Sequence, residues 1–182
     1  MELVTARLRL DALRPDDAPL LFAYRADAAV NRYQGWRPIT LVEVTHFIER
    51  QLTVEFGTPG SWRQFAIRPR DGTGLIGDLG LHFVDPDTVE LGITLALAQQ
   101  SRGFAGEAMR AALDLVFGTL GRHRAYAAVD PRNVACVRLL QGLGLRQEAL
   151  FREGWRDGAG FADEAIYALL AREWRAMATG AD

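Results

Sequence analysis

Lysine is absent from this sequence, and all 21 basic residues are arginine. Codon usage is the simplest interpretation of this bias, because arginine and lysine both serve as solvated cations on protein surfaces. The absence still excludes chemistry. Without lysine there is no Schiff-base residue and no phosphate-loop lysine, which excludes pyridoxal enzymes and typical nucleoside triphosphatases.

Cysteine, histidine and serine are also scarce. Cys136 is the only cysteine, so the chain cannot form an internal disulfide. The histidines are few and lack the spacing of a metal site, and we therefore expect no metal; they are His46, His82 and His123. The two serines, Ser61 and Ser101, lie outside any G-x-S-x-G turn, which argues against a serine hydrolase.

Long apolar runs and strong charge are missing as well. No apolar run approaches the ~20 residues of a membrane helix, and the start, MELVTARLRL, does not resemble a signal peptide. A net charge of −2 gives no basic surface for nucleic acid. We expect a soluble cytoplasmic protein that contacts neither membrane nor nucleic acid, with residues 1–182 as a single domain.

The apolar periodicity that is present predicts a mixed α+β fold. Period-two alternation and turn sequences predict strands, whereas capping residues such as Thr40 and 3.6-residue periodicity predict helices. The expected strands cover residues 7–13, 62–69, 74–84, 88–97, 122–130, 145–153 and 162–170. Three expected helices begin near residues 15, 41 and 105, and a fourth has Pro131 in its first turn and ends at Gly144.

A glycine-rich turn, QSRGFAG, leads into the helix near residue 105. Unpaired N–H groups and the positive end of the helix dipole would face this turn, and small residues would let a phosphate approach the backbone. Arg102 could add a full positive charge. A plain glycine turn before a core helix is the alternative.

Five segments share their order and motifs with one family. Gln100, Gly103 and Ala105 match the pattern Q/R-x-x-G-x-G/A, and RNVACVRLLQGLG is similar to N-x-x-S-x-x-L-L-E-x-L-G-F. TARLRLDALRPDDA is similar to its opening strand and helix, and VELGITLAL followed by GFAGEAMRAAL is similar to its fourth strand and pyrophosphate helix. FADEAIYALLAREW is similar to its closing strand with the D…Y…L…EW ending. The chain thus resembles the GCN5-related N-acetyltransferases (GNAT), in particular the ribosomal-protein N-terminal acetyltransferases.

This resemblance implies a GNAT fold, with a mostly antiparallel mixed sheet of about seven strands splayed between strands 4 and 5. Acetyl-CoA would occupy the gap as acyl donor. The implied cofactor-binding residues are Leu95, Leu97, Gln100, Ser101, Arg102, Gly103, Phe104, Ala105, Gly106, Asn133 and Arg138. Two of them have ordinary alternatives, since Asn133 could cap a helix and Arg138 could be a solvated cation.

The resemblance also implies direct attack of an amine on the thioester, for which Glu90 and Cys136 are the catalytic candidates. Alternation places Glu90 opposite the apolar face of its strand, where it could act as base; a solvent-facing glutamate is the alternative. Cys136 could protonate the thiolate or be a small buried residue, and Leu140 stands where many relatives carry a tyrosine acid.

The acceptor is expected to be a primary amine, which we interpret as a peptide or protein N-terminus. An α-amine of pKa about 8 is deprotonated more easily than a lysine-type amine of about 10.4. The expected acceptor-side residues are Tyr33, Trp36, Asp78, His82 and Trp155. A small-molecule amine such as a drug, polyamine or amino acid, and a non-catalytic acyl-CoA-binding module, remain alternatives; the sequence also allows a homodimer.

Overall fold

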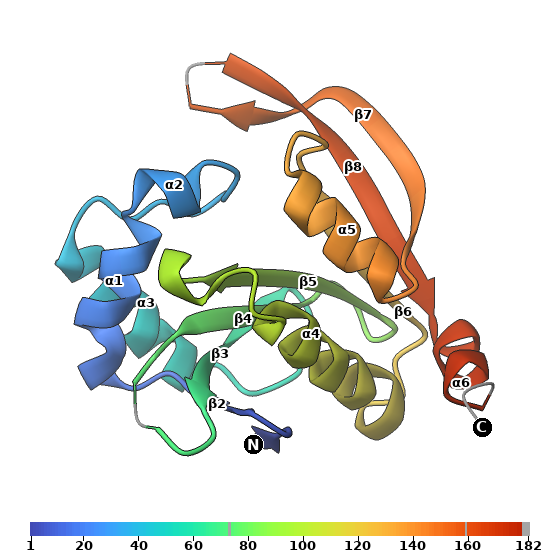
Figure 1. Ribbon diagram of the computed structural model, residues 1–182, viewed down its shortest axis with the longest axis horizontal. Helices are drawn as coiled ribbons and strands as arrows, with labels where there is room; N and C mark the ends of the chain where they lie inside the picture. The colour runs from blue at the N-terminus through green and yellow to red at the C-terminus, as the bar shows by residue number, and fades with distance from the viewer. Residues whose placement is uncertain (73, 159, 180–182) are drawn as a thin grey trace.

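A computed structural model describes residues 1–72, 74–158 and 160–179 and shows one eight-stranded sheet in the order β1-β2-β3-β4-β5-β6-β8-β7 (Figure 1). The strands are β1 (Leu3–Val4), β2 (Leu8–Ala12), β3 (Ser61–Pro69), β4 (Gly77–Phe83), β5 (Thr88–Leu95), β6 (Arg124–Val129), β7 (Arg146–Asp157) and β8 (Gly160–Leu170). The eighth strand, beyond the seven expected, is the two-residue β1 at the edge beside β2.

Helices cover both faces of the sheet (Figure 1). They are η1 (Pro15–Asp17), α1 (Ala18–Arg25), α2 (Ala28–Asn31), α3 (Leu41–Thr53), η2 (Leu97–Gln99), α4 (Phe104–Asp114) with the π-turn η3 (Leu115–Thr119), α5 (Val134–Gly142) and α6 (Ala171–Thr179). Helices α1 and α3 share one apolar cluster with Ala66 of β3, whereas α4 and α5 share another with its neighbours Phe65 and Ile67. Successive strand residues point to opposite faces, so the two clusters lie on the two sides of the sheet.

The sheet opens between β5 and β6. These strands form the sheet's parallel pair, and their register ends at Glu90 opposite Tyr126. Beyond that point β5 continues to Leu95 paired with β4, while β6 continues to Val129 paired with β8. The predicted splay is therefore confirmed, and from residue 91 onward one edge of β5 has no strand partner among the residues that the structure describes.

Local capping explains where two helices begin. The Thr40 side chain accepts a hydrogen bond from the Glu43 N–H at the start of α3, as predicted, while the Glu43 carboxylate accepts from the Ile39 N–H. The expectation that Pro131 lies in the first turn of α5 is wrong, because Asn133 is the N-cap and Pro131 precedes it. Gly144, with a φ of +88°, ends it as expected.

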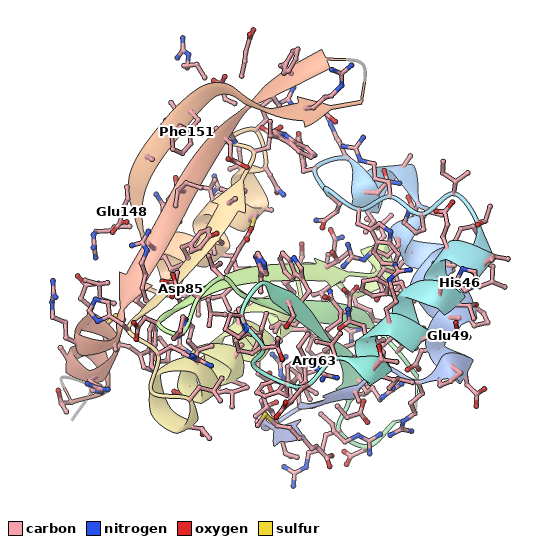
Figure 2. All side chains as sticks on the ribbon, turned by 180° about the vertical axis from the view of Figure 1, so that it is seen from behind. His46, Glu49, Arg63, Asp85, Glu148 and Phe151 are labelled. Atoms are coloured by element: carbon pink, nitrogen blue, oxygen red, sulfur yellow. The ribbon has the colours of Figure 1, made fainter. Side chains whose placement is uncertain are left out.

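The β7–β8 hairpin forms one end of the sheet, and its outer strand β7 is exposed. Figure 2 shows Glu148 and Phe151 on β7, on the side of the molecule opposite to His46 and Glu49 of α3. The chain then turns into α6, a helix that is not among those expected from the sequence. Within the described ranges, no helix combines the length and apolar content needed to cross a bilayer.

Candidate functional site

A cleft of about 590 Å³ lies where the sheet opens. Its residues come from strands β3, β5 and β6, from helices α1, α3, α4 and α5, and from the loop after α2 together with the β7–β8 hairpin. They include Tyr33, Gln34, Trp36, Arg50, Trp62, Gln64, Glu90–Ile93, Ala127–Asp130, Asn133, Cys136, Trp155 and Glu164. Six of the predicted site residues thus meet in one cavity: Tyr33, Trp36, Glu90, Asn133, Cys136 and Trp155.

Glu90 lies at the inner end of the cleft, where the sheet divides. Its Oε2 is 3.1 Å from Nδ1 of His82 on β4 and accepts a hydrogen bond from the Tyr126 hydroxyl of β6 at 3.2 Å. Burial, together with the negative charge of Glu90, raises the pKa of Tyr126 to about 12, so the phenol stays protonated as a donor. Sequence reasoning missed Tyr126, because its position depends on the β5–β6 register.

Glu164 of β8 is a second carboxylate in the cleft. Burial raises its pKa, and the charge of Glu90 raises it further. Two carboxylates that share a partly buried cavity favour either a bound cation or protonation of one of them. The position of Glu164 in the cleft depends on the pairing of β8 with β7, which a single sequence does not contain.

Asn133 and Cys136 are joined at the start of α5. The Asn133 Oδ1 accepts a hydrogen bond from the Cys136 N–H at 3.2 Å, so the expected capping role is observed. Capping uses the oxygen, and the Nδ2 group can still donate to a ligand. Burial raises the pKa of the Cys136 thiol to about 11. Proton transfer from this thiol to a CoA thiolate of pKa about 8.5 would cost about 3 kcal/mol, so Cys136 is a poor general acid.

The turn before α4 has the geometry of an anion site. Ser101 and Gly103 have φ values of +58° and +80°, and no side chain in the described part of the chain caps the helix start at Gly103. The first N–H groups of α4 are therefore open to a ligand, as a diphosphate would require. Gln100 donates from Nε2 to the Leu95 carbonyl oxygen at 3.0 Å, which ties this turn to the end of β5.

The residues around this turn show where β5 ends and where Arg102 and Arg138 lie. Leu97 lies in η2 beyond the end of β5 and is 54 % exposed, so the strand expected to reach residue 97 ends at Leu95. Arg102 donates to the Gln99 side chain at 2.8 Å, next to the turn. Arg138 is exposed on α5, away from the residues that line the cleft.

Glu107, in the first turn of α4, ties this helix to the beginning of β2. It accepts hydrogen bonds from the Thr5 hydroxyl at 2.6 Å and from the Arg7 backbone and guanidinium at 2.7 and 2.6 Å. Burial would raise the pKa of Glu107, but these bonds outweigh burial and lower it. Arg7 also donates to the Arg102 carbonyl oxygen at 3.0 Å, so the contact fixes the turn itself.

Asp78 is not at the cleft surface, in contrast to our expectation. Its side chain is 0 % exposed and forms an ion pair with Arg25, while the Tyr24 hydroxyl donates to it at 2.7 Å. The Gln64 amide donates to the same carboxylate. Asp78 therefore positions Arg25 and Gln64, which do line the cleft. The prediction failed because α1, far away in sequence, supplies the partner of Asp78.

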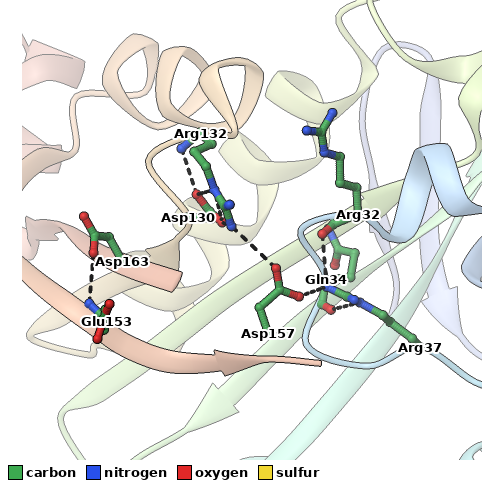
Figure 3. Close-up of polar contacts among 8 residues, drawn as sticks. All are labelled: Arg32, Gln34, Arg37, Asp130, Arg132, Glu153, Asp157 and Asp163. Atoms are coloured by element: carbon green, nitrogen blue, oxygen red, sulfur yellow. Dashed lines mark hydrogen bonds and ion pairs between the residues drawn. The ribbon is translucent and has the colours of Figure 1, made fainter. Parts of the chain in front are cut away.

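An ion-pair chain holds the tip of the β7–β8 hairpin over the cleft (Figure 3). Asp157 accepts from Arg37 at 2.7 Å and is 3.5 Å from Arg132, which also pairs with Asp130. Nearby, Trp155 approaches Gly35, where an added Cβ would lie 3.8 Å from the indole. The hairpin and the loop after α2 thus close the cavity together.

Comparisons with known proteins agree with this geometry. Residues 7–146 match the family described as "Acetyltransferase (GNAT) domain". The chain is 28 % identical over 174 residues to the uncharacterized N-acetyltransferase p20 of Bacillus licheniformis, covering 94 % of this chain and 97 % of that protein.

Two solved structures have the same fold. One is the spermidine N-acetyltransferase of Vibrio cholerae in complex with CoA and spermine, with a TM-score of 0.82, 21 % identity and coverage of 94 % and 99 % of the two chains. The other is RimL, a ribosomal L7/L12 α-N-protein acetyltransferase in complex with CoA, with a TM-score of 0.82, 15 % identity and coverage of 93 % and 98 %. At these identities the likeness concerns the fold alone.

Within the described ranges, no three or more His, Cys, Asp or Glu side chains are grouped to hold a metal.

Proposed function

The chain belongs to the GNAT acetyltransferase family and is an acetyl-CoA-dependent N-acetyltransferase, and we propose that its acceptor is the α-amine of a peptide or protein N-terminus. One observation carries the proposal: the sheet divides at Glu90, so a carboxylate lies between an unpaired strand edge and an aromatic cavity. Acetyl-CoA bound along the strand edge and an amine bound in the cavity would meet beside Glu90.

On the donor side, we assign the diphosphate of acetyl-CoA to the backbone N–H groups from Gln100 to Gly106. The pantetheine arm is an extended amide chain, and it can pair with the free edge of β5 by main-chain hydrogen bonds, up to Leu95. In this assignment Nδ2 of Asn133 donates to the arm from α5. Arg102 and Arg138 supply positive charge for the phosphates.

In the proposed reaction, Glu90 accepts a proton from the bound ammonium, directly or through water. The neutral nitrogen then attacks the thioester carbonyl carbon, a C–N bond forms and the C–S bond breaks. The amide product loses its second proton to solvent, and the thiolate leaves with a pKa of about 8.5, so it needs little help from an acid. Glu164 adds negative charge that favours binding of the ammonium before it is deprotonated.

An α-amine suits this site because it needs less help from a base to reach its neutral, nucleophilic form. At pH 7 deprotonation costs about 1.4 kcal/mol for an α-amine of pKa near 8, but about 4.6 kcal/mol for an alkylamine near 10.4. The RimL likeness agrees with an α-amine. The spermidine N-acetyltransferase likeness favours a second candidate, a small-molecule polyamine.

Thiol release from acetyl-CoA across a panel of peptides, amino acids and polyamines tests the proposal. We expect peptides with a free α-amine to give the highest kcat/KM and N-blocked peptides to give only background hydrolysis. Tight CoA binding without release by any amine would instead identify a non-catalytic acyl-CoA-binding module.

Glu90→Gln tests the base. The rate should fall and the pH–rate profile should shift to higher pH, because an amine without a base reacts only when it is already neutral. Glu49→Gln, at an exposed position of α3, is the matched control and should change neither quantity. An unchanged profile for Glu90→Gln would remove Glu90 from the mechanism.

A further inference from the structure

Trp62 is an exposed tryptophan in a fixed position on the floor of the cleft. It is 41 % exposed, although large aromatic side chains usually bury most of their surface. Its indole stacks on the His82 ring, with centroids 4.8 Å apart and planes 6° apart. His82 contacts Glu90 in turn, so the exposed indole lies one side chain away from the proposed base.

Two glycines make room for this indole. Gly80 of β4 and Gly92 of β5 are direct neighbours across the strands. A Cβ at Gly80 would lie 2.9 and 3.0 Å from Trp62 ring atoms, and one at Gly92 would lie 3.8 Å away. Glycine usually weakens the interior of a strand, but at these two positions the missing side chain leaves space for the indole ring.

Other aromatic side chains also line the cleft. Trp36 stacks on Phe47 with centroids 4.2 Å apart, and Tyr33 and Trp155 border the cavity from the loop and the hairpin. Such walls suit a flat apolar group, which gains both burial and ring stacking.

The charges of the cleft argue against a polycationic acceptor. Arg25 is compensated by Asp78, but Arg50 forms no ion pair with any residue in the described part of the chain. Its positive charge would repel the distant ammonium groups of a polyamine. Glu90 and Glu164 together suffice for one ammonium at the reacting end.

We infer that Trp62 is the platform on which the acceptor stacks, and that the acceptor is a primary amine within a few bonds of an aromatic ring. Free aromatic amino acids, arylalkylamines and peptides with an aromatic first residue share this chemistry. The inference rests on the proposed acetyltransfer and specifies its substrate class. Trp62 acts here as a specificity-determining residue, outside the proton transfers.

The dipeptides Phe-Gly and Ala-Gly test this, since both offer an α-amine and differ only in the ring. We expect kcat/KM for Phe-Gly to exceed that for Ala-Gly about tenfold, equivalent to about 1.4 kcal/mol, mainly through KM. Phenylalanine and 2-phenylethylamine, run alongside, distinguish the three sources of the ring. Trp62→Leu should reduce the preference for Phe-Gly over Ala-Gly to about twofold, and Trp62→Phe should restore most of it.

Trp174→Leu, at a tryptophan of α6 outside the cleft, is the matched control and should keep the full preference. CoA binding by each variant reports whether it is folded. Equal rates for the two dipeptides, a preference for spermidine, or an unaltered ratio in a folded Trp62→Leu would overturn the inference. If no amine releases thiol above background, the proposed function fails instead; if Ala-Gly is acetylated as well as Phe-Gly, only the aromatic acceptor fails.

Discussion

Replacing Asp78 by alanine should destabilise the protein strongly, although Asp78 lies at the base of the acceptor side. The Asp78 carboxylate is 0 % exposed, and the Arg25 side chain that pairs with it is 7 % exposed. Removing the carboxylate leaves a buried guanidinium without its counter-charge, and also removes the acceptor for Tyr24 and Gln64. Breaking a buried pair in this way costs about 3–5 kcal/mol.

Thermal unfolding measures this effect directly. For a domain of this size each kcal/mol shifts Tm by about 2–4 °C, so Asp78→Ala should lower Tm by roughly 6–20 °C. Asp78→Asn keeps the shape and some hydrogen bonds and should cost less, about 1.5–3 kcal/mol. Asp71→Ala, at an exposed aspartate, is the control and should stay within about 0.5 kcal/mol of the wild type.

The opposite pattern would refute the reasoning. If Asp78 bound the substrate at the cleft surface, Asp78→Ala would keep its Tm and raise only the KM of the amine. A wild-type Tm for Asp78→Ala would therefore show that the carboxylate does not support Arg25.

Three further substitutions test other parts of the site. Gly103→Ala places a side chain at a φ of +80°, so it should lower the free energy of unfolding by about 1–2 kcal/mol and weaken CoA binding. Gly118→Ala, in open space, should change neither quantity, and equal CoA affinities of the two variants would contradict the proposed diphosphate site. Glu164→Gln should raise Tm at pH 7, because burial and the charge of Glu90 raise the pKa of Glu164 and make its ionised form destabilising. The gain in Tm should shrink as the pH falls toward 4.5, the ordinary pKa of a glutamate, and a gain independent of pH would contradict this cause. Asp157→Asn weakens the ion pairs of the hairpin tip and should raise the KM of the amine several-fold, with little change in the KM of acetyl-CoA. Equal changes in both KM values would show that the ion-pair chain does not act on the acceptor side.

Much of the fold could be predicted from local patterns. Alternation in TVELGITLAL placed Glu90 and Leu91 on opposite faces, and the structure agrees, since Leu91 belongs to the apolar core whereas Glu90 contacts His82 and Tyr126. Turn and capping residues located most elements to within a few residues. The errors at Leu97 and Pro131 are boundary errors, which depend on tertiary hydrogen bonds that no short window contains.

The site was harder to predict because it is built across strands. Trp62, His82, Glu90 and Tyr126 form one row over four strands, and this row exists only once three registers are fixed. A single sequence does not contain these registers. The glycines at 80 and 92 were a usable signal, since bare positions in adjacent strands indicate a large side chain from a neighbouring strand.

Titration calorimetry of the intact protein with CoA tests the central claim, that the N-terminus of α4 and the free edge of β5 together bind the acyl donor. We predict saturable heat with one site per chain, and a clearly weaker response for Gly103→Ala than for Gly118→Ala. No heat from the folded wild-type protein, under conditions where a known GNAT enzyme responds normally, would contradict the account.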